Sequence, residues 1–467
     1  MSLCALHLSQ AAAEIRDGRI TSAELVNDCL ERIKEVDQRV QAWAFLEPEH
    51  AMRQAAAADQ HRKQGKPLGP LHGVPIGIKD IFDTSDMPTE LGSPLWVGRT
   101  PRRDAVAVAR LRSAGAVIMG KTVTTEYAYF HPGKTRNPHD YERTPGGSSS
   151  GSAAAVAACM VPGAIGSQTN GSVIRPAAFC GVVGFKPTHG FIPRSGALLL
   201  SRTLDHVGVF ARTVEDAALL AATLAGYDEE DPDTRLLAPP PLAAVATSEP
   251  PLPPRIAFAR TPAWQHAEPV TREAFGELCA ALAETIEEVE LGASFGRAID
   301  RHRTIMEVEM AHNLRRDYEK GGDKLSATLR KVIECGRGHA AVDYLGAVAG
   351  SAPLNEALDA VFDEFDAILT PAAPGEAPGD LGTTGNPVFC TIWTYLGTPA
   401  VTLPLMQTEA GMPLGVQLVG RRDNDARLLR TARWLVRTCE RGWRRRGRTE
   451  TAAGAAGSRR PRKRKSS

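Results

Sequence analysis

The sequence predicts an α/β fold, in which helices cover the faces of a β-sheet. Short apolar runs at residues 74–78, 116–119 and 182–185 have the length and the apolar character of buried strands. A helical pattern at 104–114 lies between the first two runs, and it is followed by Gly115, a residue type that often ends helices. This alternation of strands and helices is typical of α/β proteins.

The C-terminal half continues the same organisation. Four further segments have the character of strands: 255–259, 367–369, 400–403 and 415–419. A long helical stretch, about 265–365, separates the first of these strands from the second. A final helix is predicted over 425–436.

Length and charge predict one large acidic domain with a basic tail. The chain has 467 residues, of which 43% are hydrophobic, and its net charge is +1. Residues 437–467 carry +10, which leaves −9 for residues 1–436. An acidic body argues against nucleic acid as the main partner of the folded part. Because the tail lacks apolar periodicity, it is predicted to be disordered, and the domain is predicted to cover 1–436.

Cysteine usage and hydropathy predict a cytoplasmic protein. The eight cysteines are scattered, with no C-x-x-C pair and no Cys/His cluster at zinc-ligand spacing, so they are expected to be reduced thiols. The N-terminus lacks the basic segment and the long apolar run of a signal peptide. No stretch approaches the roughly 18 apolar residues that a membrane span requires. The sequence leaves open whether the chain forms a homodimer.

Three segments contain residue types that could take part in catalysis. Residues 144–158 pass abruptly from Gly and Ser to Ala, which predicts a tight turn followed by a helix. Residues 166–172 (GSQTNGS) form a second small-residue loop, whose successive N–H groups can surround an anion. Residues 71–80 place Lys79 directly after an apolar run, where burial would lower the pKa of its amine.

Each of these segments also has an ordinary structural interpretation. A Gly/Ser loop before a helix is usually a turn, a single lysine beside an apolar run usually extends to the surface, and Ser172 could cap a turn. The functional interpretation depends on their joint occurrence. Ser148 follows Lys79 after 69 positions, and Ser172 follows Ser148 after 24.

Taken together, the segments resemble the three sequence blocks of the amidase signature family. The lysine block corresponds to 71–80, the Gly-Gly-Ser-Ser block to 146–158 and the nucleophile block to 166–187. The resemblance covers about residues 5–436 and is weakest between 225 and 365. It implies a three-layer α/β/α sandwich around a mixed central β-sheet, with the site blocks within 71–215. It also implies hydrolysis of a carboxamide C–N bond to a carboxylate and ammonia or an amine.

The resemblance further implies roles for individual residues. Ser172 corresponds to the nucleophile, Ser148 to a bridging serine with a cis peptide bond, and Lys79 to the base. The oxyanion would be held by the backbone N–H groups of Thr169, Asn170, Gly171 and Ser172. Such a triad is chemically coherent, because a hydroxyl attacks only when a base removes its proton, and a lysine is a base only when its pKa is lowered. The expected substrate is a small amide, and no metal or organic cofactor is expected.

The loop before the nucleophile departs from the family pattern. Many members have two glycines there, whereas this chain has Asn170 and Gly171, and its arginine is Arg175. Asparagine tolerates left-handed backbone geometry better than most residues, so the loop is expected to keep its conformation. The effect of Asn170 on substrate choice stays open.

Alternatives from other classes fit the sequence less well. Residues 115–122 (GAVIMGKT) match the pattern of a phosphate-binding loop, but their apolar character is that of a buried strand. Asp205 and His206 could be imagined in a Ser-His-Asp site with Ser172, but adjacent residues of an extended segment face opposite ways. An inactive binding protein on the same scaffold is disfavoured because all three triad positions are present.

One alternative belongs to the same family, namely the amidase subunit of a tRNA-dependent amidotransferase. Residues 125–131 (TEYAYFH) lack the small, glycine-rich character associated with that subunit, which favours a free-standing amidase.

The helical stretch at 265–365 is expected to line the substrate pocket, because substrate choice is usually determined by such variable regions. Its polar candidates are Glu307, Glu309, His312 and Arg315. Each of them also fits a solvated helix face.

Overall fold

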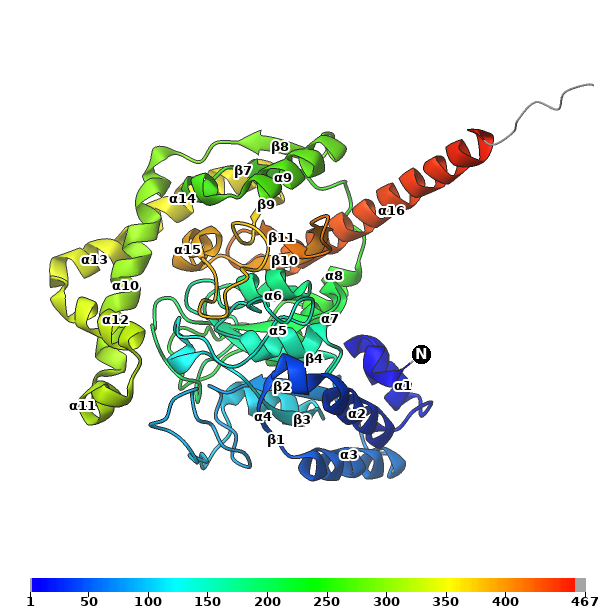
Figure 1. Cartoon of the computed structure of the whole chain (residues 1–467), viewed down its shortest axis with the longest axis vertical. Coiled ribbons are helices and arrows are strands. Elements are labelled where there is room, and N and C mark those ends of the chain that lie inside the picture. Colours follow the sequence, from blue (N-terminus) through cyan, green and yellow to red (C-terminus); the bar gives the residue numbers. More distant parts are fainter. Residues whose placement is uncertain (1, 458–467) are drawn as a thin grey trace, which may run out of the picture.

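The computed structural model describes the backbone of residues 2–457 and the side chains of residues 2–442. One mixed sheet of eleven strands forms its centre, with helices on both faces (Figure 1). The predicted three-layer α/β/α sandwich is therefore confirmed.

The sheet contains two groups of parallel strands, separated by an antiparallel middle, and its edge strand β1 (Trp43–Leu46) is also antiparallel to its neighbour. Strands β3, β2 and β4 are mutually parallel at one end, and β9, β7 and β8 are parallel at the other. All remaining neighbours pair antiparallel. In spatial order the strands are β1 (Trp43–Leu46), β3 (Val117–Thr122), β2 (Pro75–Lys79), β4 (Gly163–Gln168), β6 (His206–Ala211), β5 (Val183–Lys186), β10 (Ala400–Gln407), β11 (Pro413–Val419), β9 (Ala367–Pro371), β7 (Ile256–Ala259) and β8 (Ile286–Val289).

Glycines on β4 mark the close approach of helices on the two faces. A Cβ on Gly163 would lie 3.3 Å from Leu220 of α7 (Val214–Leu224), whereas one on Gly166 would lie 2.6 Å from Ser149, just before α5 (Ser150–Ala157). Residues three apart on a strand point to opposite faces, so α5 and α7 cover opposite sides of the sheet. Helix α6 (Ile174–Cys180) packs on β5, β10 and β11.

The other helices surround this core. Within the described residues, no helix combines the length and the apolar character that crossing a membrane requires. Helices α10 to α13 project on one side of the molecule, on the left of Figure 1. The remaining helices are α1 (Leu8–Arg16), α2 (Ser22–Val40), α3 (Pro48–Lys63), α4 (Val106–Ser113), α8 (Leu242–Thr247), α9 (Pro269–Ala281), α10 (Ala298–Asn313), α11 (Arg315–Gly321), α12 (Ala327–Gly338), α13 (Ala341–Ala349), α14 (Ala352–Glu364), α15 (Val388–Tyr395) and α16 (Asp425–Gly457).

The predicted strands are present, with ends that differ by a few residues. Four strands were not predicted from the sequence: β1, β4, β6 and β8. Strand β8 interrupts the helical stretch predicted over 265–365, which the structure divides among α9 to α14 and short turns.

The last helix is longer than the sequence suggested. It was predicted over 425–436, whereas α16 runs from Asp425 to Gly457, and the disorder expected of the 437–467 tail stays a prediction. Alanine, arginine and glutamate favour helix without needing an apolar face, which explains the continuation. Residues 458–467 of the predicted tail lie outside the described residues.

We predict opposite stability effects for alanine at two helical glycines. Gly336 of α12 packs against α10, where a Cβ would lie 1.9 Å from the carbonyl oxygen of Glu307. Gly336→Ala should therefore lower the free energy of unfolding by about 1–3 kcal/mol through overpacking. Gly276 of α9 is exposed and has no atom within 4 Å of its added Cβ. Gly276→Ala should therefore raise the free energy of unfolding by about 0.5–1 kcal/mol. Urea unfolding of both variants measures these effects, and equal effects would contradict the close packing of α10 and α12.

Candidate active site

Lys79 is the last residue of β2 and lies in the centre of the fold. Its side chain is fully buried, and its Nζ is 2.7 Å from Ser148 Oγ and 2.9 Å from Ser167 Oγ of β4. Burial lowers the pKa of this amine well below 10.5, while the negative charge of Asp205 acts in the opposite direction. A buried amine with hydroxyl partners is favoured in its neutral form.

Ser148 lies in the turn before α5, and the peptide bond between Gly147 and Ser148 is cis. The carbonyl oxygen of Gly147 accepts a hydrogen bond from Arg175, and the carbonyl oxygen of Ser148 accepts one from the Thr125 N–H. The turn is therefore held on both sides of its cis bond.

The loop between β4 and α6 contains Ser172. Side chains from other helices hold two backbone carbonyl groups of this loop. His302 Nε2 lies 2.9 Å from the carbonyl oxygen of Thr169, and Thr394 Oγ1 donates a hydrogen bond to the carbonyl oxygen of Asn170. In the part of the chain that the structure describes, none of the N–H groups of residues 169–172 donates to a protein acceptor. The N–H groups of these four residues, all of which line the cavity that also contains Ser148, are therefore free of partners in the described part of the protein.

The two N–H groups that follow Ser172 are not free, because the side chain of Gln168 accepts hydrogen bonds from both. Its Oε1 accepts from the N–H groups of the next two residues, Val173 and Ile174, at 2.8 and 3.0 Å. Its Nε2 donates to Thr394 Oγ1 of α15, which in turn donates to the Asn170 carbonyl. Gln168 and Thr394 were not predicted as site residues. Their contact spans 226 positions of the sequence, and no local pattern signals it.

Ser172 and Ser148 line the same narrow cavity, of about 20 Å³. Ser172 is buried, with 8% of the surface of the residue exposed. Aromatic and apolar side chains form much of the cavity wall: Tyr129, Phe130, Leu200 and Met306. The structure thus brings together all the site residues predicted from the sequence, with Lys79 directly behind Ser148.

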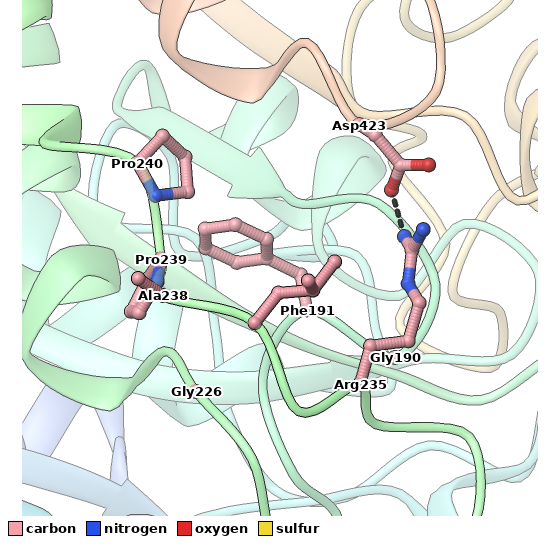
Figure 2. Close-up of a pocket in the computed structure, with 9 residues that line it drawn as sticks. Gly190, Phe191, Gly226, Arg235, Ala238, Pro239, Pro240 and Asp423 are labelled. Carbon is pink, nitrogen blue, oxygen red and sulfur yellow. Dashed lines mark hydrogen bonds and ion pairs between the residues drawn. The ribbon is translucent and has the colours of Figure 1, made fainter.

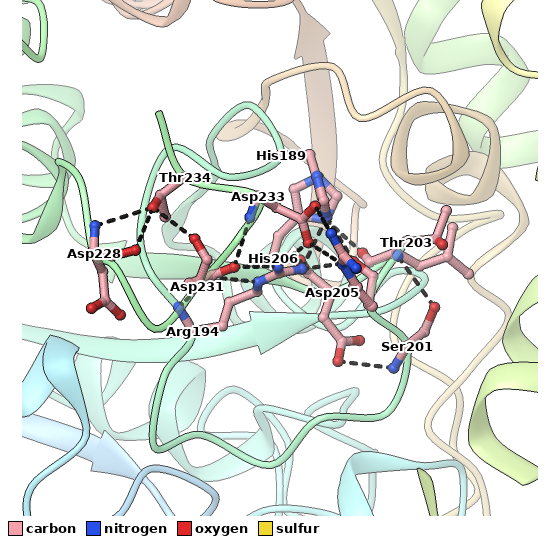
Figure 3. A network of polar contacts seen from close by, with 12 residues as sticks. His189, Arg194, Ser201, Thr203, Asp205, His206, Asp228, Asp231, Asp233 and Thr234 are labelled. Carbon is pink, nitrogen blue, oxygen red and sulfur yellow. Dashed lines mark hydrogen bonds and ion pairs between the residues drawn. The ribbon is translucent and has the colours of Figure 1, made fainter. Parts of the chain in front are cut away.

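Asp205 links the Ser172 loop to a polar network that Figure 3 shows. Its carboxylate accepts from Thr169 Oγ1 at 2.6 Å and from the N–H groups of Leu200 and Ser201. Burial raises the pKa of this carboxyl to about 6, while these hydrogen bonds act in the opposite direction. Further out, Arg194 forms ion pairs with Asp231 and Asp233.

The Ser-His-Asp alternative does not assemble. The Nδ1 atom of His206 is 2.6 Å from the Leu204 carbonyl oxygen, and its Nε2 has no hydrogen-bond partner among the described residues. Asp205 is engaged with Thr169 instead of His206. Neither residue therefore forms a relay to Ser172.

The segment that resembles a phosphate-binding loop is strand β3, as its apolar character suggested. Lys121 within it is buried, and its Nζ lies 3.2 Å from Asp80 and 2.6 Å from Thr89 Oγ1. It also donates to the carbonyl oxygens of Phe82 and Pro88. The hydrogen bonds and the ion pair of the Lys121 ammonium group are thus made to residues 80–89, and they stabilise the loop that follows β2.

Arg175 is fully buried behind Ser172, and burial lowers the pKa of its guanidinium to about 10. It donates to the carbonyl oxygens of Gly147 and Gly385 and to Thr384 Oγ1. Arg175 is the one charged side chain among the described residues that line the Ser172 cavity, and its terminal nitrogens are already bonded.

A larger cleft of about 500 Å³ adjoins this cavity and shares Tyr129, Phe130, Asn170 and Met306 with it. Glu307 lines this cleft, whereas Glu309 lines a separate cavity and bonds Ser201, Thr203 and Tyr344. The other two polar candidates, His312 and Arg315, are not among the cleft-lining residues.

A cavity of about 260 Å³ lies elsewhere, beside Phe191 and the Arg235–Asp423 ion pair (Figure 2). It shares no lining residue with the cavity at Ser172. Across the described residues, no group of three or more His, Cys, Asp or Glu side chains is arranged to hold a metal ion.

Comparison with known proteins agrees with this geometry. The family model described as Amidase matches residues 24–429. The chain is 35% identical to a glutamyl-tRNA(Gln) amidotransferase subunit from Chloroflexus aggregans, over 91% of this chain and 94% of that protein. It is 34% identical to a putative amidase AmiD from Mycobacterium tuberculosis, over 91% and 92% of the two chains.

Solved structures show the same similarity. A crystal structure of an amidase superposes with a TM-score of 0.80 at 31% identity, covering 92% of this chain and 99% of that one. Native peptide amidase from Stenotrophomonas maltophilia gives a TM-score of 0.81 at 28% identity, covering 93% and 97%. The chain therefore belongs to the amidase family.

Proposed function

We propose that this protein is an amidase that hydrolyses the C–N bond of a small carboxamide through an acyl-enzyme. Ser172 is the nucleophile, Ser148 carries its proton, and Lys79 is the base. The observation that carries this proposal is the buried hydrogen bond between Lys79 Nζ and Ser148 Oγ, at the cavity that Ser172 also lines. Hydrolysis of C–N bonds by members of this family supports it.

The proton path follows from the contacts of Lys79. A neutral amine has one lone pair, which accepts the Ser148 hydroxyl proton while an N–H donates to Ser167 Oγ. Ser148 then takes the proton of Ser172 as the Ser172 Oγ attacks the carbonyl carbon. When the C–N bond breaks, the proton returns along the same path to the leaving nitrogen. Water repeats the sequence on the acyl-enzyme and releases the carboxylate.

The negative charge that develops on the carbonyl oxygen is stabilised by the free N–H groups of residues 169–172. Because their carbonyl groups are already fixed by His302 and Thr394, the loop needs little reorganisation when the charge forms. Preorganised donors in a cavity that excludes water contribute strongly to catalysis, by about 100- to 1000-fold for one donor.

The amidotransferase subunit is a second candidate, because one of the reported relatives bears that name. Such a protein would have to recognise glutamine, whose α-carboxylate calls for a cation. Of the described residues around the Ser172 cavity, only Arg175 is charged, and its terminal nitrogens are bonded to the protein. The cation of the adjoining cleft, Arg303, is 60% exposed and lies 3.6 Å from Asp300. This favours the free-standing amidase. Ammonia release from glutamine by the purified chain, exceeding that from simple amides, would reverse the preference.

Replacement of the triad should show that its members act as a unit. Ser172→Ala and Lys79→Ala should each lower kcat by about a thousandfold or more, because each breaks the same proton path. The double variant should be little worse than Ser172→Ala alone. Steady-state kinetics on a panel of amides measures this, with the exposed Ser248→Ala as the matched control. Multiplicative losses in the double variant would show that Lys79 and Ser172 act independently.

Ser148→Ala should be milder than either of these replacements. A water molecule can partly replace the lost hydroxyl between Ser172 and Lys79. Labelling by a serine-directed fluorophosphonate should persist in this variant at a reduced rate and disappear in Ser172→Ala. Normal labelling of Ser172→Ala would contradict the assignment of the nucleophile.

The pH dependence should follow the titration of Lys79. Only the neutral amine is a base, so kcat/KM should rise with pH and level off well below 10.5, because burial lowers the pKa of Lys79. The carboxylate of Asp205 raises that pKa, so Asp205→Asn should move the rising limb to lower pH. Asp343→Asn, which removes an exposed carboxylate of α13, is the control and should leave the limb in place. A shift to higher pH in Asp205→Asn would contradict this account.

A further inference from the structure

Helix α10 forms one wall of the 500 Å³ cleft beside Ser172. Three of its charged side chains line this cleft: Asp300, Arg303 and Glu307. Asp300 and Arg303 are 76% and 60% exposed and lie 3.6 Å apart, so solvent screens both charges. Glu307 differs, because only 16% of its side chain is exposed.

One oxygen of Glu307 is bonded and the other is open. Its Oε2 lies 2.6 Å from His339 Nε2, which fixes the orientation of the carboxylate. Its Oε1 has no hydrogen bond to any residue that the structure describes. The neighbouring Glu309 has three partners on its two oxygens, namely Ser201, Thr203 and Tyr344. Glu309 therefore holds the fold, whereas Glu307 keeps an acceptor unused in the cleft.

Glu307 lies near the junction of the cleft with the catalytic cavity. The preceding residue, Met306, lines both spaces, and so does Tyr129. Glu307 and Tyr129 line the same cleft, and burial, followed by the charge of Glu307, raises the pKa of Tyr129 to about 12. A substrate with its amide at Ser172 and its other end in the cleft would pass this point.

We propose that Glu307 recognises a protonated amine on the non-reacting end of the substrate. The carboxylate is held in place by His339 and leaves one oxygen free in the cleft, and a cationic donor complements both its charge and its hydrogen-bonding capacity. The substrate class is therefore an amide that carries a primary or secondary amine, and no carboxylate beside that amine, at a distance from the scissile bond. This inference rests on the proposed function only for the orientation of the amide.

The test compares ω-aminoalkanamides of increasing chain length with n-alkanamides of the same lengths. The wild-type protein should prefer the amine-bearing member at the matching length by about tenfold or more in kcat/KM. Glu307→Gln keeps the size of the side chain and removes its charge, and it should lower kcat/KM for that substrate by about ten- to a hundredfold. Activity on n-alkanamides, which carry no amine, should fall clearly less than activity on that substrate.

Glu334→Gln is the matched control, because Glu334 is an exposed carboxylate of α12 that does not line the cleft. It should leave the preference for the amine unchanged. A preference that is absent from the wild type, or that persists in Glu307→Gln, would overturn the proposal.

Binding separates this inference from the proposed hydrolysis. Calorimetry with Ser172→Ala should detect an ω-aminoalkanamide, and adding Glu307→Gln should weaken its binding by about ten- to a hundredfold. This result would support recognition by Glu307 even if the wild type hydrolysed none of the amides. Equal binding by the two variants would overturn recognition by Glu307, whatever the hydrolysis assays show.

Discussion

The burial of Lys79 without an acidic partner is the constraint on which the site depends. Lys121, one of the other buried lysines, lies on the neighbouring strand β3 and allows a comparison. Lys121 is within 3.2 Å of Asp80 and has three further oxygen partners, so the effect of burial, which lowers its pKa, is partly offset by Asp80. Lys79 forms no ion pair with any described carboxylate, and its two partners are hydroxyls. Two lysines of similar burial thus have different chemistry, because their partners differ.

The surroundings of Ser172 are organised to leave hydrogen-bond donors unused. Gln168 takes the N–H groups that follow Ser172, while Thr394 and His302 take the carbonyl oxygens that precede it. Asp205 fixes the side chain at the start of the same loop through Thr169. Fixing the acceptors and leaving the donors free is the arrangement that the proposed stabilisation of a negative charge by this loop requires.

Much of this site could be predicted from the sequence, because its residues lie in short blocks with unusual composition. Glycines around Ser148 and an apolar run before Lys79 are local signals, and the resemblance to the amidase signature family gave them roles. The supporting contacts are not local. Gln168 meets Thr394, and Glu309 meets Ser201, only after distant segments pack together.

The strands of the fold were predicted less completely than the site, because four of the eleven strands were missed. Strand β4 (GAIGSQ) is largely composed of small residues that give little strand signal, although burial in the sheet centre makes it a strand. Strand β8 exposes two of its four residues, Glu287 and Glu288, and so resembles a loop or helix face. The length of α16 was missed because helix propensity acts without apolar periodicity.

The most direct test of the central claim is the titration of the Lys79 side chain itself. Nuclear magnetic resonance of the protein with labelled lysine, with Lys79→Arg used to assign the signal, would follow the charge of this amine against pH. The account predicts that Lys79 loses its proton at a pH well below 10.5, so that the amine is neutral over the pH range in which the protein is active. A Lys79 that remained protonated up to the ordinary range of lysine would contradict its role as the base.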